Sequence, residues 1–141
     1  MTEPRVSFEP FVDAAVKAFV VDGVDLHNVA ATGHSAYYPV NFILRGDCDE
    51  VLGGLLGQIW GLWLHVHFLW VAEPARGTGN ATRLMRAAED YAIERGCVGV
   101  YLNTFSFQAP GFYRKLGYQM VSTIEGNPPG HQHHLLTKQL R

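Results

Sequence analysis

The sequence predicts a single α/β domain, more narrowly α+β, built on a mixed, mainly antiparallel sheet with helices on both faces. Three observations support this. An apolar strand pattern that begins at Leu64 runs through a glycine turn into a helical pattern that stops near Gly96. Short strand-like segments bounded by turn residues precede and follow that unit. The last two of these strand-like segments are joined by Pro128, Pro129 and Gly130, a composition typical of a turn between antiparallel strands.

The start of the chain is the least regular part. Residues 5–8 alternate as a short strand, and residues 10–19 have helical periodicity. We expect Gly23 and Gly33 to break the helical pattern, with a short helix and a loop over residues 24–38. Little chain therefore lies between the first two predicted strands.

The remaining elements follow in a clear order. The patterns predict strands at 40–44, 51–60 and 64–72, a helix at 79–95, a strand at 98–103, a short helix at 108–116, and a final antiparallel pair at 120–124 and 133–138. The longer helix should bury Ala81, Leu84, Met85, Ala88 and Ala92 on one face. Gly96 and Gly117 stand where helices commonly end.

Size and charge narrow the class of protein. The chain has 141 residues, so we expect residues 1–141 to form one domain that buries roughly two-thirds of the surface exposed by the extended chain. The net charge is −2 with no basic cluster, which argues against a nucleic-acid or anionic-membrane partner. Cys48 and Cys97 lack paired spacing, and no signal-peptide pattern is seen, so we expect free thiols in a cytoplasmic protein.

The apolar run at residues 52–72 is about as long as a membrane span. Four glycines and two histidines interrupt it. Two strands joined by a tight turn at Gly61 fit this composition better than a membrane helix.

The segment Arg76-Gly77-Thr78-Gly79-Asn80-Ala81 lies between the strand and the helix. Unpaired N–H groups and the positive dipole end of a helix N-terminus together favour a phosphate, so a pyrophosphate-bearing cofactor is expected. A dinucleotide-binding loop needs a third glycine where Thr82 stands, and the G-K-[S/T] of a nucleotide-binding P-loop is absent.

What remains of the loop is R-x-x-G-x-A, formed by Arg76, Gly79 and Ala81, and it resembles the Q/R-x-x-G-x-G/A loop of the GNAT superfamily of N-acetyltransferases. About thirty residues later, residues 109–118 read APGFYRKLGY, similar to the A-x-x-x-Y-x-x-x-G-F/Y signature of that superfamily. Residues 104–118 and a later PPGH also resemble a small bacterial subgroup without an assigned substrate. The resemblance covers residues 40–141 and implies a GNAT-like sheet.

The resemblance implies that acetyl-CoA is the cosubstrate. Its pyrophosphate would lie on Arg76, Gly77, Thr78, Gly79, Asn80 and Ala81, with charge-assisted bonds from the Arg76 guanidinium. Backbone groups near Leu69 and Val71 would pair with pantetheine as an added strand does.

The resemblance also suggests catalytic residues. His65 and His67 are two apart, so we expect both to project to one face with Leu69 and Val71. This H-x-H pair resembles that of the serotonin N-acetyltransferase branch, where it handles the amine proton; structural histidines are the alternative. Tyr113 matches the tyrosine that protonates the leaving thiolate, with plain packing as the alternative.

The other candidate residues are histidines and aromatic residues. His131, His133 and His134 suggest a metal, but alternation separates the last two and no Cys or carboxylate joins them, so we expect a surface or pocket cluster and no metal. The tryptophans are expected mainly in the core, although Trp63 and Tyr101 are candidates to line an acceptor pocket.

The predicted activity is N-acetylation of a primary amine of a small molecule, by direct attack in a ternary complex. No covalent acetyl-enzyme is expected, because neither cysteine lies in a motif. The alternatives are a protein or peptide acetyltransferase, for which the acids at residues 47–50 are few, and a non-catalytic acyl-CoA-binding module. The acceptor, the acyl chain and the choice between monomer and homodimer stay open.

Overall fold

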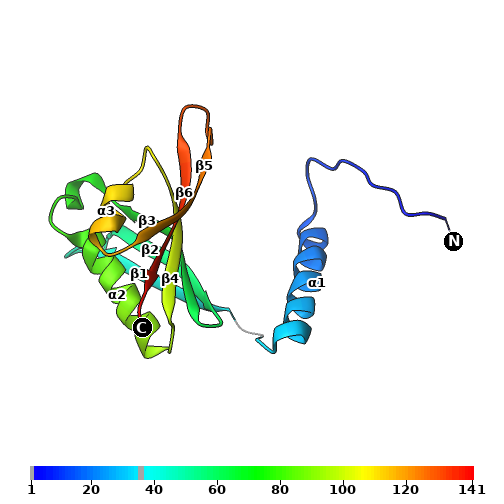
Figure 1. The fold of residues 1–141 in the computed structure, drawn as a ribbon, viewed down its shortest axis with the longest axis horizontal. Coiled ribbons are helices and arrows are strands. Elements are labelled where there is room, and N and C mark those ends of the chain that lie inside the picture. The colour runs from blue at the N-terminus through cyan, green and yellow to red at the C-terminus, as the bar shows by residue number, and fades with distance from the viewer. Residues whose placement is uncertain (1, 35–36) are drawn as a thin grey trace. The chain divides into compact units, whose positions relative to one another are not determined.

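The structure, a computed structural model, describes residues 2–34 and 37–141 (Figure 1). The chain divides into two compact units, residues 1–36 and residues 37–141. The prediction of one domain over residues 1–141 stays a prediction.

The first unit contains one helix, α1 (Ala14–Thr32). The strand predicted at residues 5–8 is wrong: residues 2–13 have no regular secondary structure and pair with no described strand. Gly23 does not break α1 either, because one glycine costs only about 1 kcal/mol within a helix that is rich in alanine. Gly33 does end it, with φ at 75° and its N–H donated to the Val29 carbonyl.

The second unit contains the sheet and two α-helices. Its elements are β1 (Tyr38–Arg45), β2 (Val51–Trp60), β3 (Trp63–Val71), a 3₁₀ turn η1 (Glu73–Ala75), α2 (Asn80–Glu94), β4 (Gly99–Phe105), α3 (Pro110–Lys115), β5 (Gln119–Glu125) and β6 (Gln132–Gln139). Each predicted strand and helix from residue 40 onward is therefore confirmed, with bounds that move by at most two residues.

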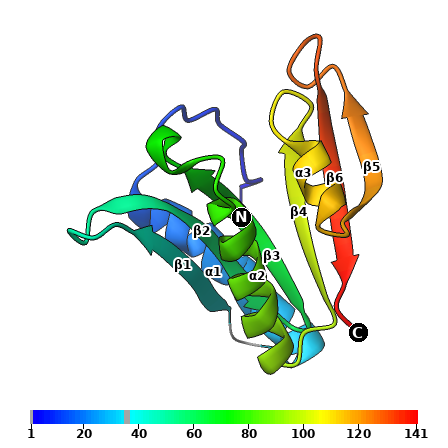
Figure 2. The same cartoon turned by 90° about the vertical axis from the view of Figure 1, so that its left-hand side faces the viewer.

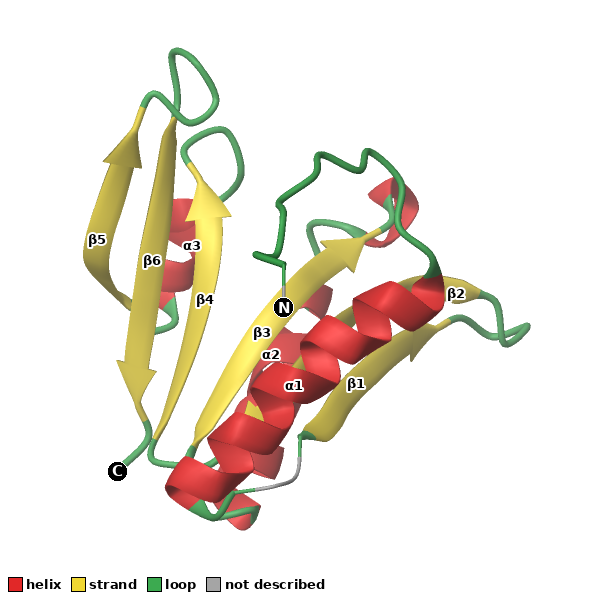
Figure 3. Cartoon of the chain, turned by 90° about the vertical axis from the view of Figure 1, so that its right-hand side faces the viewer, coloured by secondary structure: helices red, strands yellow, loops and turns green. Residues whose placement is uncertain are grey.

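The sheet is mixed and mainly antiparallel, as predicted. Its strand order is β1-β2-β3-β4-β6-β5, and the β3–β4 pair alone is parallel. Helices α2 and α3 both pack on one face, which faces the viewer in Figure 2 and lies behind the strands in Figure 3. The parallel neighbours β3 and β4 are therefore joined by a crossover through α2, whose N-terminus lies near the end of β3.

Two glycines explain how β2 and β3 meet. Gly61, with φ at 62°, forms the tight turn that places Trp60 opposite Trp63. A Cβ on Gly57 would stand only 2.4 Å from the His65 carbonyl oxygen, so no larger residue fits there without a backbone shift.

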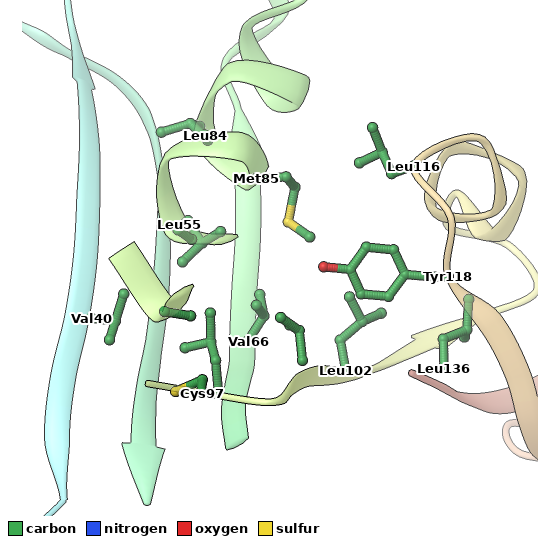
Figure 4. Close-up of a cluster of buried hydrophobic side chains, with 14 of the residues drawn as sticks. Val40, Leu55, Val66, Leu84, Met85, Cys97, Leu102, Leu116, Tyr118 and Leu136 are labelled. Atoms are coloured by element: carbon green, nitrogen blue, oxygen red, sulfur yellow. The ribbon is translucent and has the colours of Figure 1, made fainter. Parts of the chain in front are cut away.

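The core lies between α2, α3 and the sheet. In α2 the buried apolar side chains are Leu84, Met85, Ala88 and Ala92, as the helical periodicity predicts, with Ala81 packed at the edge. Figure 4 shows Leu84 and Met85 beside Leu55 and Val66 of the sheet, with the Tyr118 ring nearby. This packing fixes the start of α2 against the end of β3, where the glycine loop lies.

Candidate active site

Strands β3 and β4 separate after four paired positions. Their parallel register runs from Trp63 opposite Gly99 to Val66 opposite Leu102 and stops there, although both strands continue (Figures 2 and 3). Beyond Val66, the β4-facing edge of β3 has no strand partner among the described residues. An unpaired strand edge is a template for an extended ligand.

A cavity of about 670 Å³ occupies this divergence, and we call it the splay cavity. Its walls come from both strands, from the glycine loop and from α3 with the turn before it. They include His67, Leu69, Val71, Arg76, Ala81, Asn103, Thr104, Gln108, Phe112 and Tyr113. Residues that the two sequence motifs place far apart therefore meet around one space.

A β-bulge at His67 changes the orientation of the strand. Leu56 pairs with Phe68 but the next residue of β2 pairs with Val66, so His67 is an extra residue without a partner in β2. Leu64 and Val66 face the core before the bulge, whereas Leu69 and Val71 face it afterwards. The prediction that the histidines share a face with Leu69 and Val71 is therefore wrong, because the extra residue reverses the alternation.

The two histidines are nevertheless adjacent. Their ring centroids are 4.3 Å apart, and the His65 ring also stacks on Tyr101 at 4.2 Å. Burial lowers the pKa of His65, and the neighbouring His67 adds to this, because a second charge close by disfavours protonation. A neutral imidazole can accept a proton.

The glycine loop presents a row of free amides. Gly77 and Gly79 have φ values of 81° and 84°, a region that favours glycine, and helix α2 starts directly afterwards. The N–H of Arg76 bonds to Glu73 and that of Arg83 to Gly79, whereas the amides of residues 77–82 donate to no group in the described chain. These donors are available to an anion.

Side chains of the loop brace this geometry. The Asn80 amide nitrogen donates to the Ala75 carbonyl at 2.8 Å, and its oxygen accepts from Arg83 at 3.0 Å. A second cavity of about 290 Å³, the loop cavity, lies along residues 76–82 and shares Val71, Arg76, Ala81 and Phe112 with the splay cavity.

Arg76 has a structural contact that the sequence did not suggest. Its Nε donates to the Val71 carbonyl oxygen at 2.7 Å, so this oxygen already has a partner and the guanidinium is held at the junction of the two cavities. The terminal guanidinium nitrogens make no hydrogen bond with the described chain. They stay available for a phosphate.

Tyr113 of α3 lines the splay cavity. Its ring packs edge-on against Phe112 and Tyr118, with centroids at 5.1 Å and 6.0 Å. Burial raises the pKa of the Tyr113 hydroxyl, which therefore stays protonated at neutral pH. No described residue forms a hydrogen bond with this hydroxyl, so it is free to serve a ligand.

A third cavity of about 550 Å³, the aromatic cavity, contains the predicted pair Trp63 and Tyr101 together with His65. The expectation that the tryptophans lie mainly in the core is wrong. None of the three is fully buried, and Trp70 is 60% exposed because it follows the bulge and faces away from α2.

His133 and His134 lie on opposite sides of the sheet, as alternation predicts, and His131 precedes β6. His134 is buried and its Nδ1 lies 2.9 Å from the Thr123 hydroxyl, whereas His133 packs on Phe105 and His131 on Phe107. Within residues 2–34 and 37–141, no three His, Cys, Asp or Glu side chains gather as metal ligands. None of the helices described is long and apolar enough to span a membrane.

Several residues around the site were not identified from the sequence. Thr104 and Gln108 form a hydrogen-bonded wall of the splay cavity at 3.1 Å, and Phe112 borders two cavities. Phe112 directly precedes Tyr113 in α3, so the sequence could have identified Phe112 as a site residue. Nothing in the local pattern distinguishes Thr104 or Gln108.

Comparison with known proteins identifies the class. The acetyltransferase (GNAT) family model matches residues 12–118, and the chain belongs to this family. The predictions of a GNAT-like fold and of an enzyme, an acetyl-CoA-dependent N-acetyltransferase in class, are thereby confirmed.

Relatives and solved structures agree with this assignment. The chain is 47% identical over 96 residues to blasticidin-S acetyltransferase of Streptomyces morookaense, which covers 67% of this chain and 71% of the relative. It is 34% identical over 112 residues to an acetyltransferase of Agrobacterium fabrum, and this match covers 79% of this chain and 82% of the relative. The crystal structure of an acetyltransferase from Bacillus cereus superimposes with a TM-score of 0.83 at 29% identity, covering 94% of this chain and 97% of that one.

Proposed function

We propose that the chain transfers the acetyl group of acetyl-CoA to a primary amine of a small molecule, by direct attack in a ternary complex. The observation that carries this proposal is the row of unpaired amides at residues 77–82 along the loop cavity, which borders the splay cavity that Tyr113 lines. The relative named blasticidin-S acetyltransferase supports a small-molecule acceptor.

The free amides fit a pyrophosphate, since they are donors without acceptors and a Cβ on Gly77 or Gly79 would meet no protein atom. The Arg76 guanidinium adds positive charge beside them. The β4-facing edge of β3 near Leu69 suits an extended amide-bearing chain. The Val71 carbonyl is less available to such a chain, because it already accepts a hydrogen bond from Arg76.

Acetyl-CoA supplies a thioester whose carbonyl carbon is open to a neutral amine. The amine nitrogen forms the new C–N bond and the C–S bond breaks. We assign the ammonium proton to His65 or His67, directly or through water, and we assign protonation of the departing sulfur to the Tyr113 hydroxyl. The second proton that the nitrogen loses as the amide forms returns to the Tyr113 oxygen. Burial of Tyr113 keeps this proton in place until the sulfur develops negative charge.

A direct mechanism agrees with the position of the cysteines. Cys48 is an exposed free thiol in the β1–β2 turn, and Cys97 is a free thiol buried in the core, where burial raises its pKa. Neither lines the splay, loop or aromatic cavity. A covalent acetyl-cysteine therefore has no suitable nucleophile there.

The test is acetylation of a panel of amines with acetyl-CoA, with blasticidin S first and aminoglycosides, polyamines and lysine peptides beside it. Thiol release and the mass gain of one acetyl group are measured together. We expect a small-molecule amine to be acetylated, and Tyr113→Phe to lower kcat by about 10²-fold to 10⁴-fold with unchanged acetyl-CoA affinity.

Other outcomes would replace the proposal. Acetylation of peptides alone would indicate a protein acetyltransferase. Tight acetyl-CoA binding without transfer to any acceptor would indicate a binding module. An unchanged rate in Tyr113→Phe would make that tyrosine a packing residue.

A further inference from the structure

The aromatic cavity has a composition unlike that of the splay cavity. Its walls include Tyr37, Gln58, Trp60, Trp63, His65 and Tyr101. No Asp, Glu, Lys or Arg is among the described residues that line it. A ligand group in this cavity therefore meets ring faces and an amide rather than a charge.

Strand pairing explains why these side chains gather. Trp60 and Trp63 are opposite each other across the Gly61 turn, and Gln58 pairs with His65 in the same hairpin. His65 in turn lies beside Tyr101 in the parallel β3–β4 pair. Residues directly opposite in a sheet have adjacent side chains, so the cavity wall is built on regular strands.

The rings are arranged as stacking surfaces. Tyr37 and Trp60 stack with centroids 5.8 Å apart and planes at 15°, and His65 and Tyr101 stack at 4.2 Å and 12°. Trp63 meets Tyr101 edge-on at 6.3 Å. A planar ligand ring can extend such a stack or meet its ring edges, and aromatic contacts of both kinds are favourable.

Two further observations favour an uncharged ring. Burial lowers the pKa of His65 and raises the pKa of Tyr101, so both wall residues stay neutral, and the cavity disfavours charge. The Gln58 side-chain amide makes no hydrogen bond with any described residue, and it offers one donor and one acceptor side by side. A heteroaromatic edge with a matching acceptor and donor satisfies both.

The cavity also lies beside the candidate catalytic groups. His65 lines the aromatic cavity and His67 lines the splay cavity, and their rings are 4.3 Å apart. An acceptor whose ring occupies the aromatic cavity can therefore present an amine on a short linker to the histidine pair.

We propose that the aromatic cavity binds an uncharged, planar heteroaromatic ring of the acceptor, and so selects amines that carry such a ring. The inference rests on the proposed acetyl transfer only for the placement of the amine. Ring binding itself is independent of the reaction.

The experiment compares 2-(2-aminopyrimidin-5-yl)ethylamine, whose ring edge carries a nitrogen acceptor beside an N–H donor, with 2-cyclohexylethylamine, which has a saturated ring on the same linker. The phenyl analogue, 2-phenylethylamine, is measured beside them. Two quantities are measured on the full chain: the Kd of each amine without acetyl-CoA, by calorimetry, and kcat/KM with acetyl-CoA. We expect the heteroaromatic amine to be favoured on both scales by about 10-fold to 100-fold.

Three variants locate the effect. Trp60→Leu should reduce the preference for the aromatic ring, and Gln58→Leu should abolish the preference for pyrimidinyl over phenyl while keeping that for phenyl over cyclohexyl. Tyr38→Leu is the matched control, since Tyr38 is next to Tyr37 but packs under the Arg95 guanidinium at 4.6 Å, outside the cavity. The preference should survive in this variant.

The outcomes separate the two proposals. Selective binding of the heteroaromatic amine without acetylation supports the ring site and contradicts the transferase. Equal Kd and equal kcat/KM for the two amines overturns the ring site, and so does absence of binding by both. A preference that survives both Trp60→Leu and Gln58→Leu also overturns it.

Discussion

Replacing Glu89 should destabilise the fold more than any exposed change in α2. Glu89 is only 3% exposed, and its carboxylate accepts from the Tyr118 hydroxyl at 2.8 Å and from Lys138 Nζ at 3.1 Å on both oxygens. Half-exposed Arg86 adds a contact at 3.2 Å. These bonds join α2 to the segment after α3 and to β6. Burial and the Glu89 carboxylate raise the pKa of Tyr118, which remains the donor.

The expected cost follows from what Glu89→Gln leaves behind. The side chain of Lys138 is 17% exposed, so its ammonium becomes a largely buried charge without a carboxylate, which costs about 3 to 5 kcal/mol. For a chain of this size that is roughly 10 to 20 °C in Tm. Arg86 contributes little to the estimate, because it is half in water.

The assay is urea unfolding followed by circular dichroism, with Glu94→Gln as the control. Glu94 is exposed in the same helix and has no described partner, so its change should stay within about 0.5 kcal/mol. The double variant Glu89→Gln, Lys138→Gln should cost less than the sum of the single changes, since it removes the unpaired ammonium. A loss below about 1 kcal/mol in Glu89→Gln would refute the reasoning.

Two further predictions concern the β2–β3 hairpin. His65→Gln and His67→Gln should each lower kcat/KM, and less than additively in combination if both act on one proton. Because the pKa of His65 is lowered, this imidazole stays neutral at pH values below the ordinary His range. The loss of kcat/KM in the variants should therefore be largest near pH 6 and shrink towards pH 9. His133→Gln is the control, and an unchanged pH–rate profile would make the pair structural. Gly57→Ala should lower the free energy of unfolding by about 1 to 3 kcal/mol, because its Cβ meets the His65 carbonyl. Gly111→Ala, with open space around it, should lower it by less than about 1 kcal/mol. Equal unfolding midpoints for the two variants would contradict this.

Much of the second unit could be predicted from local patterns. The strand–loop–helix unit around Gly79 was predicted within one residue of its bounds, because a glycine turn separates two different periodicities. The bulge at His67 could not be predicted. Every residue from 68 to 71 is apolar, so an inserted residue at His67 leaves no mark in the alternation, yet it determines which side chains face the core.

Other parts of the site depend on contacts between distant segments. Glu89 lies on the apolar face of α2, four residues after Met85, and this spacing is the only local sign of its burial. Its partner Lys138 is 49 residues away. Gln58 and Tyr101 likewise meet only through strand pairing that involves β2, β3 and β4. Sequence patterns assign faces to such residues but not their partners.

The central claim is that the amides around Gly79 hold acetyl-CoA, and a matched pair of glycine variants tests it. Gly79 and Gly130 have φ values of 84° and 82°, and a Cβ on either would meet no protein atom. Gly79→Ala and Gly130→Ala should therefore carry similar folding costs, but only the Cβ at residue 79 lies where the pyrophosphate would approach the backbone.

The decisive measurement is the acetyl-CoA Kd by calorimetry, with melting curves beside it. Wild type and Gly130→Ala should bind equally and gain about 2.7 kcal/mol of stability at 100 times the Kd, or roughly 5 to 10 °C. Gly79→Ala should bind at least about 10-fold more weakly and lose most of that shift. If millimolar acetyl-CoA leaves the wild-type melt unmoved, or if Gly79→Ala binds as tightly as Gly130→Ala, the loop is not the cofactor site.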